Sequence, residues 1–280
     1  SSDVTVDLGF EPQWLLIRRS DAAEDWNILD VMRGVGAEGS NTVRLEPNTS
    51  DAEASSSTAI GITPTGFFTA SNTGRYNASG GTYIYIAIRR GTKVPTSATE
   101  VFDIKTSVNT NPAFTSDHVI DLAMFTHKTS SDNRYWSARL ASRGYLKSNA
   151  TNAEATNQAT WDFGDTQFGH YNATGLGTNY LGYFWKRAPN FCDVVAFDGG
   201  GAGDVVSHNL GVKPDLMMYK RRSAANDWIV YNSIDGANYA MFLNKTDARE
   251  SQIQWWNNTE PTATNFTTGS KAFSGSTYIA

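Results

Sequence analysis

The 280-residue sequence is short of several features that would point to a particular class of protein. It holds one cysteine, Cys192, which excludes an internal disulfide framework and most cysteine-based zinc sites. Charged residues make up only 18% of the chain and the net charge is −5, so there is no basic surface for nucleic acid or anionic lipid. No apolar run approaches the roughly 18 residues of a membrane span. We therefore expect no nucleic-acid partner and no membrane insertion.

Aromatic residues, by contrast, are plentiful at 12% of the chain. Aromatic and β-branched residues gather in short runs, such as 14–17, 82–88 and 228–231, which have the length and composition of β-strands. No segment keeps the 3.6-residue period of an amphipathic helix over about eleven residues. Clusters of glycine, asparagine and serine separate the runs, as turns do. The sequence therefore predicts an all-β protein.

The chain also repeats itself. Residues 8–14 recur at 210–216, a shift of 202 positions, and the same shift carries residues 25–26 onto 227–228 without a gap. A more diverged version lies between them, in which residues 135–136 fall where 227–228 do. The spacing indicates a period of about 95–100 residues. We expect three modules, a first, a middle and a third, with the boundaries 1–100, 101–192 and 193–280.

About seven or eight strand-like runs per module fit a two-sheet antiparallel β-sandwich. A propeller or a solenoid, in which each module contributes four-stranded sheets, is the alternative. The first and third modules should superpose, with Trp26 on Trp228 and Tyr83 on Tyr278. The tryptophans that recur with the repeat, among them Trp136 of the middle module, are expected to anchor the cores. The third module stops inside a strand, which predicts that the native chain extends further.

Two stretches resemble a module that occurs in tandem in bacteriophage structural proteins. The first comprises residues 9–19, 25–26 and 77–85, and the companion version comprises residues 207–215 and 255–262. The middle module lacks the Gly-x-x-Pro start of this pattern, so its assignment rests on spacing alone. The resemblance implies a role on the virion surface, typically in a tail fibre. It transfers no catalytic residue to this chain.

Four adjacent residues form the candidate binding site: Trp255, Trp256, Asn257 and Asn258. An exposed aromatic ring stacks on the C–H face of a sugar, and neighbouring amides bind its hydroxyl groups, so this group predicts a platform for a host-surface glycan. Because adjacent strand residues point to opposite faces, we expect at most one of the two tryptophans to be buried against a given sheet. Packing of both tryptophans in a core or an interface is the alternative.

Other polar clusters predict neither a metal nor a cofactor. The four histidines form no helical metal-binding pair, and the glycine-rich loop 198–204 has too few carboxylates for calcium. Basic residues at strand ends, such as those at 220–222, are interpreted as charges that discourage edge-to-edge aggregation. Glycoside hydrolysis uses two carboxylates about 5–10 Å apart. One acidic group deserves a test of that activity, and its members are Asp162, Asp165, Asp193 and Asp198.

These observations lead to three hypotheses for function. The first is a non-enzymatic bacteriophage virion protein, a tail-fibre or spike segment that contacts the host surface. The second is a head decoration or fibre-shaft protein with a purely structural role, and the third is a polysaccharide-degrading tailspike. We expect the protein on the exterior of the particle, with other virion proteins as partners. Because fibres are symmetric homo-oligomers, a homotrimer is expected.

Overall fold

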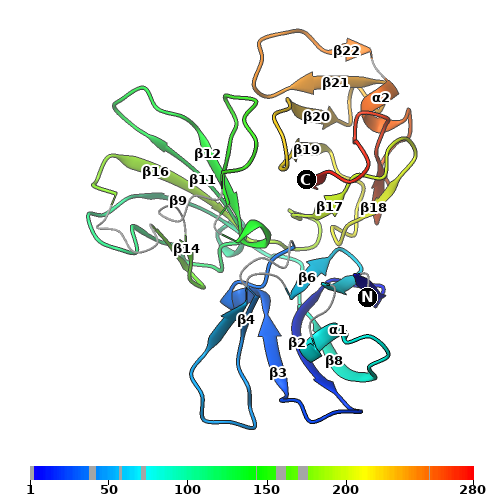
Figure 1. Cartoon of the computed structure of the whole chain (residues 1–280). Coiled ribbons are helices and arrows are strands. Elements are labelled where there is room, and N and C mark those ends of the chain that lie inside the picture. Colours follow the sequence, from blue (N-terminus) through cyan, green and yellow to red (C-terminus); the bar gives the residue numbers. More distant parts are fainter. Residues whose placement is uncertain are drawn as a thin grey trace. The chain divides into compact units, whose positions relative to one another are not determined.

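The computed structural model describes residues 3–37, 42–56, 59–70, 74–142, 144–155, 162–169, 176–251 and 253–280. Nearly all of its regular structure is β, and both α-helices, α1 (Gly74–Asn77) and α2 (Ile253–Trp256), are single turns (Figure 1). None of the helices in these ranges is long and apolar enough to cross a bilayer. The chain divides into two compact units, the first formed by residues 1–91 and 139–142 and the second by the remainder.

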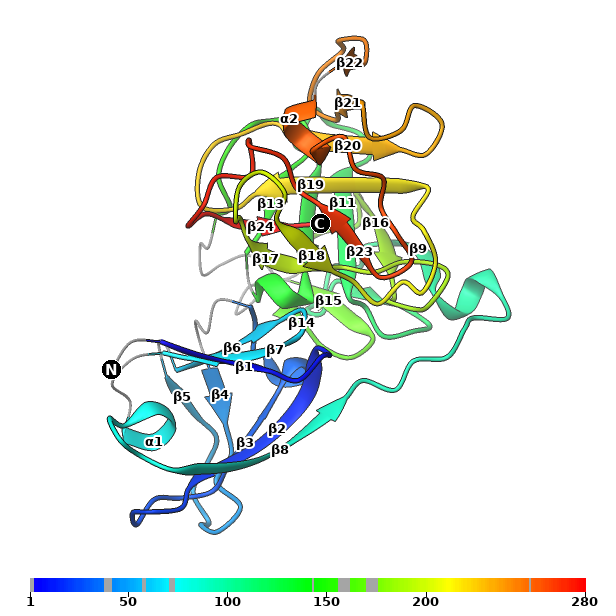
Figure 2. The same cartoon turned by 90° about the vertical axis from the view of Figure 1, so that its right-hand side faces the viewer.

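The first unit contains two antiparallel sheets and a hairpin that an isolated bridge between Leu45 and Ile28 links to the larger sheet (Figures 1 and 2). The sheets have the strand orders β3-β2-β8 and β1-β7-β6, and the hairpin pairs β4 with β5. The strands are β1 (Val4–Asp7), β2 (Pro12–Arg19), β3 (Asn27–Asp30), β4 (Thr42–Arg44), β5 (Ala54–Ser56), β6 (Ile60–Thr63), β7 (Gly66–Thr69) and β8 (Tyr83–Arg89). Two 3₁₀ turns also belong to this unit, η1 (Val31–Arg33) and η3 (Arg139–Ala141).

The core of the first unit follows from the alternation of side chains along β2. Leu15 and Ile17 are buried, whereas the residues between and beside them are only partly covered, because successive strand residues point to opposite faces. The buried face lies against the smaller sheet, where Phe67 of β7 meets Tyr85 of β8 edge to face at 5.4 Å. The first module is therefore a small two-sheet sandwich.

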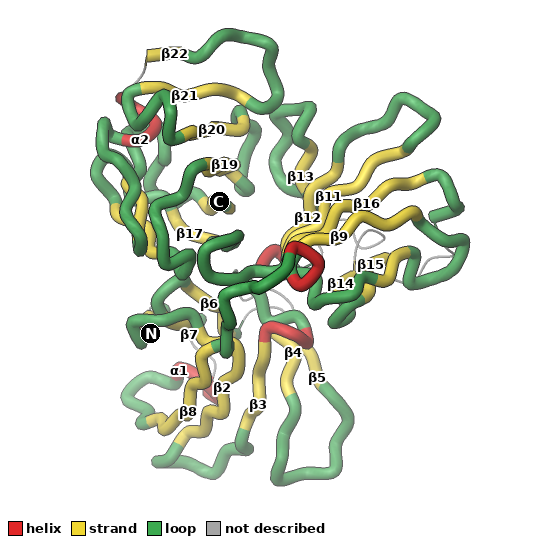
Figure 3. Tube along the Cα trace, turned by 180° about the vertical axis from the view of Figure 1, so that it is seen from behind, coloured by secondary structure: helices red, strands yellow, loops and turns green. Residues whose placement is uncertain are grey.

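The second unit contains two larger sheets, β13-β12-β11-β16-β9 and β17-β24-β19-β20-β21-β22, and two smaller ones, β10-β15-β14 and β18-β23 (Figures 1 and 3). Its 3₁₀ turn is η2 (Ala98–Glu100). The strands of the middle module are β9 (Phe102–Thr106), β10 (Phe114–Thr115), β11 (Leu122–His127), β12 (Tyr135–Ala138), β13 (Leu146–Lys147), β14 (Asp162–Phe163), β15 (Gln167–Gly169) and β16 (Tyr180–Trp185). Those of the third module are β17 (Ala196–Asp198), β18 (Val205–Ser207), β19 (Leu216–Arg221), β20 (Trp228–Asn232), β21 (Tyr239–Phe242), β22 (Glu250–Ser251), β23 (Asn265–Thr267) and β24 (Thr277–Ile279).

One pattern of strand pairing occurs three times. In the larger sheets, β2 pairs with β3 and β8, β11 pairs with β12 and β16, and β19 pairs with β20 and β24. In the smaller sheets, β1 pairs with β7, β10 with β15 and β18 with β23. All of these pairings are antiparallel. The predicted tandem sandwich-like modules are therefore confirmed, and the propeller or solenoid alternative does not describe the fold.

Hydrogen bonds at the start of β3 and of β20 align the first and third modules residue by residue. The Trp26 N–H donates to Asn48 Oδ1 at 2.9 Å, and the Trp228 N–H donates to Asn244 Oδ1 at 2.9 Å. Each asparagine amide also donates at 2.8 Å to the aspartate that precedes the tryptophan, Asp25 or Asp227. The predicted equivalence of Trp26 and Trp228 is confirmed.

The same hydrogen bonds correct the alignment of the middle module. Here the Arg134 N–H donates to Asn149 Oδ1 at 3.1 Å, and the Asn149 amide donates to Asn133 Oδ1 at 3.2 Å. Arg134 therefore takes the position of Trp26, and the placement of Trp136 there is wrong by two residues. An error of two is easily made from sequence, because it keeps every side chain on the same face of its strand.

A tyrosine in the last strand aligns the other end of the two modules. Tyr83 Oη accepts the Ala78 N–H at 2.7 Å, and Tyr278 Oη accepts the Phe273 N–H at 2.9 Å. Each hydroxyl also donates to a carbonyl oxygen of the preceding loop, that of Gly74 at 2.8 Å or Lys271 at 3.4 Å. The predicted equivalence of Tyr83 and Tyr278 is confirmed.

The modules differ at the outer edge of the larger sheet. β9 covers the edge of β16, and β17 covers the edge of β24. Among the strands that the structure describes, β8 pairs with β2 alone and forms the end of its sheet. Its isoleucines Ile84, Ile86 and Ile88 are 48%, 56% and 52% exposed.

Candidate functional site

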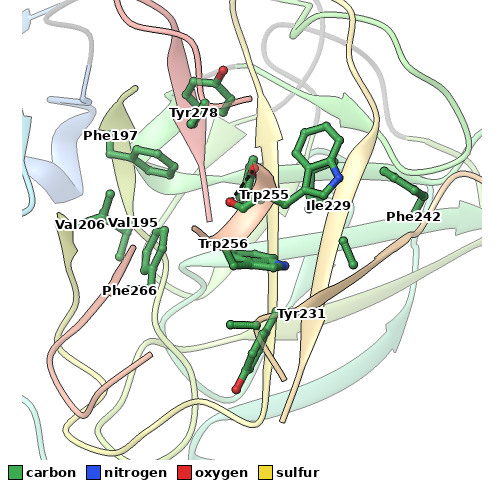
Figure 4. Packing of buried hydrophobic residues seen from close by; sticks show 14 residues of the cluster. Val195, Phe197, Val206, Ile229, Tyr231, Phe242, Trp255, Trp256, Phe266 and Tyr278 are labelled. Atoms are coloured by element: carbon green, nitrogen blue, oxygen red, sulfur yellow. Dashed lines mark hydrogen bonds between the residues drawn. The ribbon is translucent and has the colours of Figure 1, made fainter. Parts of the chain in front are cut away.

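The two tryptophans of the predicted glycan platform lie in the core of the third module (Figure 4). Trp255 is 7% exposed and Trp256 is 1% exposed. The ring of Trp256 meets Tyr219 edge to face at 5.1 Å and Tyr231 at 5.7 Å, while Trp255 meets Phe242 at 5.9 Å. With so little of either ring exposed, neither tryptophan presents a face on which a sugar could stack.

The premise of an exposed aromatic face is therefore wrong for both tryptophans. The physical reason is that residues 253–256 form a helical turn, so two adjacent side chains can reach the same core instead of alternating as in a strand. Asn257 and Asn258 follow with φ angles of 50° and 53°, left-handed conformations that asparagine tolerates at the end of a helix. Both asparagines are exposed, but they have no exposed tryptophan beside them.

The four candidate catalytic aspartates have different environments. Asp193 accepts the Arg187 Nε–H at 2.6 Å and the Asn209 N–H at 2.7 Å, so its charge is neutralised inside the fold. Asp165 and Asp198 are exposed, and the side chain of Asp162 lies outside the described residues. Within the described ranges, no three His, Cys, Asp or Glu side chains are grouped so that they could hold a metal ion.

A buried ion pair lies where the middle and third modules meet inside the second unit. Arg222, just after β19, donates from Nε to Glu154 Oε2 at 2.7 Å and from Nη2 to Oε1 at 2.8 Å. Their side chains are only 3% and 5% exposed. The backbone reinforces the contact, because the Glu154 N–H donates to the Arg222 carbonyl at 2.9 Å. A bidentate pair fixes both the distance and the angle between the segments that carry it.

Lys220 lies two residues before this pair and is fully buried. Its ammonium group donates to the Thr151 carbonyl at 3.2 Å and to the Arg221 carbonyl at 3.1 Å. Burial lowers the pKa of Lys220 to about 8, because the charged form loses its hydration. Two carbonyl dipoles solvate the ammonium only in part, so this lysine joins the modules at an electrostatic cost.

Aromatic contacts complete the join. The Trp228 indole donates from Nε1 to the Lys147 carbonyl at 2.8 Å and lies 6.0 Å from the ring of Trp136. Trp136 in turn stacks on Trp185 at 5.6 Å. We refer to Glu154, Lys220, Arg222, Trp136 and Trp228 as the module join. These side chains hold two sheets together, and the polar groups of four of them are engaged by protein partners: Glu154, Lys220, Arg222 and Trp228.

Sequence reasoning missed the module join. The sequence predicts that residues 220–222 are charges at a strand edge, but Lys220 and Arg222 are buried. The shift of 202 carries a signal that could have found them. Arg222 corresponds to Ser20 and Lys220 to Arg18, so the third module has an additional basic group where the first has a small hydroxyl.

A second charged centre stabilises the loop beyond α2. Glu260 accepts hydrogen bonds from Lys213 Nζ at 2.9 Å, the Ala237 N–H at 2.7 Å and Tyr231 Oη at 2.7 Å. The Lys213 ammonium and these donors lower the pKa of Glu260 to about 2. The carboxylate links three loops of the third module, a structural task that needs no ligand.

A family model described as a domain of unknown function, DUF7483, matches residues 1–90 and residues 190–280, together well over half of the chain. The chain belongs to this family. The two matched segments are the first and the third module. The middle module lies outside the match but has the same pattern of strand pairing. No curated protein and no solved structure matches the chain.

Proposed function

We propose that this DUF7483 chain is a non-enzymatic structural protein of a bacteriophage virion, a tail-fibre or spike segment that presents tandem β modules to the host surface. The observation that carries the proposal is the module join, because its buried side chains link two repeats within one compact unit. Proteins that bear load or span distance gain from such joins, since a flexible linker would leave neighbouring modules free to reorient.

The chemistry of the perturbed groups supports a scaffold over an enzyme. Catalytic sites place groups with shifted pKa values in a cleft, where substrate reaches them. Lys220 and Glu260 have shifted pKa values, but each is bound by protein carbonyls, hydroxyls or amides of its own module or the adjacent one. Their shifts follow from burial and ion pairing within the fold.

Immunogold electron microscopy tests the proposal. Antibodies raised against the purified chain would be applied to intact particles of the phage that encodes it. Label on the tail fibres or spikes is expected. Label confined to the head would replace this role with that of a decoration protein, and absence of the chain from purified particles by mass spectrometry would contradict a virion role.

A polysaccharide assay separates binding from cleavage. The purified chain would be incubated with surface polysaccharide of the host, and the length of the sugar chains followed by size-exclusion chromatography. Retention without shortening is expected. Shortening that Asp165→Ala abolishes would contradict the non-enzymatic assignment.

A further inference from the structure

We propose that His208 is an acid-sensitive latch, which holds the loop after β18 against the linker between the middle and third modules and releases this loop when it is protonated. The loop comprises residues 208–211 and the linker comprises residues 186–195. The Leu210 N–H donates to His208 Nδ1 at 3.2 Å. A ring nitrogen that accepts a hydrogen bond carries no proton, so the neutral ring has its proton on Nε2. Protonation of Nδ1 places a second N–H against that of Leu210 and removes its acceptor.

Leu210 and the residue before it attach the loop to the linker. The Leu210 carbonyl accepts the Asn190 N–H at 2.8 Å, and the Asn209 N–H donates to Asp193 Oδ2 at 2.7 Å. Asp193 in turn pairs with Arg187 Nε at 2.6 Å, and these two side chains are 8% and 10% exposed. Because His208 fixes the residue whose carbonyl accepts from the linker, loss of its hydrogen bond loosens the loop and the linker together.

The surroundings of His208 favour its neutral form. The residue is 9% exposed, and burial lowers the pKa of His208 below its usual value of 6.5, because an imidazolium would lose its hydration. The Asp193 carboxylate and the backbone carbonyls of Thr262 and Asn265 favour the charged form, but burial has the larger effect. The charge of Asp193 is also neutralised by Arg187.

Acid therefore weakens the latch. The pKa of His208 is lowered in the closed loop and returns towards 6.5 when the loop opens, so the open state binds more protons as the pH falls below 6.5. The stability of the closed state is fully present above this value and is lost as the pH falls through the lowered pKa. The module join is a separate attachment, because none of its five residues belongs to the loop or to the linker. Acid thus loosens one of two attachments between the same modules.

The first module has the corresponding loop without a titratable acceptor. Leu8 is the counterpart of Leu210, and its N–H donates to the Thr65 carbonyl at 2.7 Å. Val6 stands where the third module has His208. A backbone carbonyl does not titrate in this range of pH, so the Leu8 amide is a matched reference for the Leu210 amide within one protein.

Nuclear magnetic resonance of the imidazole nitrogens tests the protonation state. In the full chain at about pH 7.5, the ring of His208 is expected to carry its proton on Nε2 and to titrate with a midpoint below 6.5. A proton on Nδ1 at that pH, or a midpoint above 6.5, would overturn the proposal.

Amide hydrogen exchange tests the release of the loop. After correction for the intrinsic effect of pH on exchange, protection of the Leu210 and Asn190 amides should fall about tenfold between about pH 7 and about pH 5. Protection of the Leu8 amide should change less than about twofold. Equal falls at Leu8 and Leu210 would show general acid destabilisation and contradict a latch at His208.

Substitutions separate the titration from the hydrogen bond. His208→Asn places an amide oxygen near the position of Nδ1, where it can accept the Leu210 N–H but does not titrate, so protection should no longer depend on pH. His208→Val copies the first module and should lower the protection of Leu210 equally at both pH values. His127→Asn, in β11 of the middle module, is the control and should keep the wild-type response. An undiminished fall of protection in His208→Asn would overturn the proposal.

Discussion

The last strands of the first and third modules have the same local structure and opposite surroundings. Tyr83 and Tyr278 make the same two kinds of hydrogen bond with the loop before them. The next residue is Ile84 in one strand and Ile279 in the other, and they are 48% and 8% exposed. Equivalent sequences therefore form the same local hydrogen bonds in both modules. The burial of their side chains depends instead on which strands and modules lie beside them.

The outer faces of the larger sheets differ in the same way. In the first module Arg18 lies over the ring of Trp26 at 5.5 Å, and both side chains remain partly exposed. In the third module their counterparts, Lys220 and Trp228, are buried by the middle module. Equivalent positions therefore serve as surface in one module and as interior in another.

Breaking the buried ion pair should have the largest effect. Arg222→Ala leaves Glu154 charged in the interior and should lower the free energy of unfolding of the second unit by about 3–5 kcal/mol. The measurement is urea unfolding, and Arg19→Ala, which removes an exposed pair with Asp21 in the first module, is the control. The double variant Arg222→Met, Glu154→Met should recover most of the loss. Equal stability of Arg222→Ala and wild type would show that the pair does not hold the join.

The buried lysine should make the second unit more stable at alkaline pH. The folded pKa of Lys220, about 8, lies below its unfolded value of 10.5, so the folded state binds fewer protons between these values and stability rises as the pH rises through 8. We expect a gain on the order of 2 kcal/mol between pH 7 and about 9.5, below the range where tyrosines ionise. Unfolding at several pH values should show a flatter profile for Lys220→Met, whereas Arg18→Met should keep the wild-type profile.

Alanine substitutions of the equivalent isoleucines, Ile84 and Ile279, should lower the free energy of unfolding by different amounts. Ile279→Ala removes a buried side chain and should lower the stability of the second unit by about 2 kcal/mol. Ile84→Ala removes a side chain that is 48% exposed and should lower the free energy of unfolding of the first unit by well under about 1 kcal/mol. Thermal unfolding followed by circular dichroism measures both. A larger loss for Ile84→Ala would mean that β8 is covered within the chain.

The equivalent tyrosines should behave alike. Tyr83→Phe and Tyr278→Phe each remove a hydroxyl that accepts one backbone N–H, and each should cost about 1 kcal/mol. Amide hydrogen exchange at Ala78 and Phe273 gives a local readout, since both N–H groups lose their acceptor. Faster exchange at only one of the two amides would contradict the equivalence of the loops.

Much of the fold could be predicted from the sequence. The repeat, its shift and the all-β composition were sufficient to predict tandem sandwich-like modules and to pair Trp26 with Trp228. The predicted equivalence of Trp136 with Trp26 was wrong by two residues. Side chains alternate with a period of two along a strand, so a shift of two residues leaves the hydrophobic pattern unchanged. The prediction for Trp255 and Trp256 failed because four residues of helix, too short to show a period, turned both indoles into the core.

The sequence by itself determined the strands, the turns and the loop hydrogen bonds, since these join residues that are near in the chain or recur with it. The tertiary structure alone decided that Lys220 and Arg222 are interior and that Trp256 is core. Burial is a property of what packs against a side chain, and those neighbours come from segments up to about one module away in sequence. Repeated sequence therefore fixes repeated local geometry, while each module acquires its own surroundings.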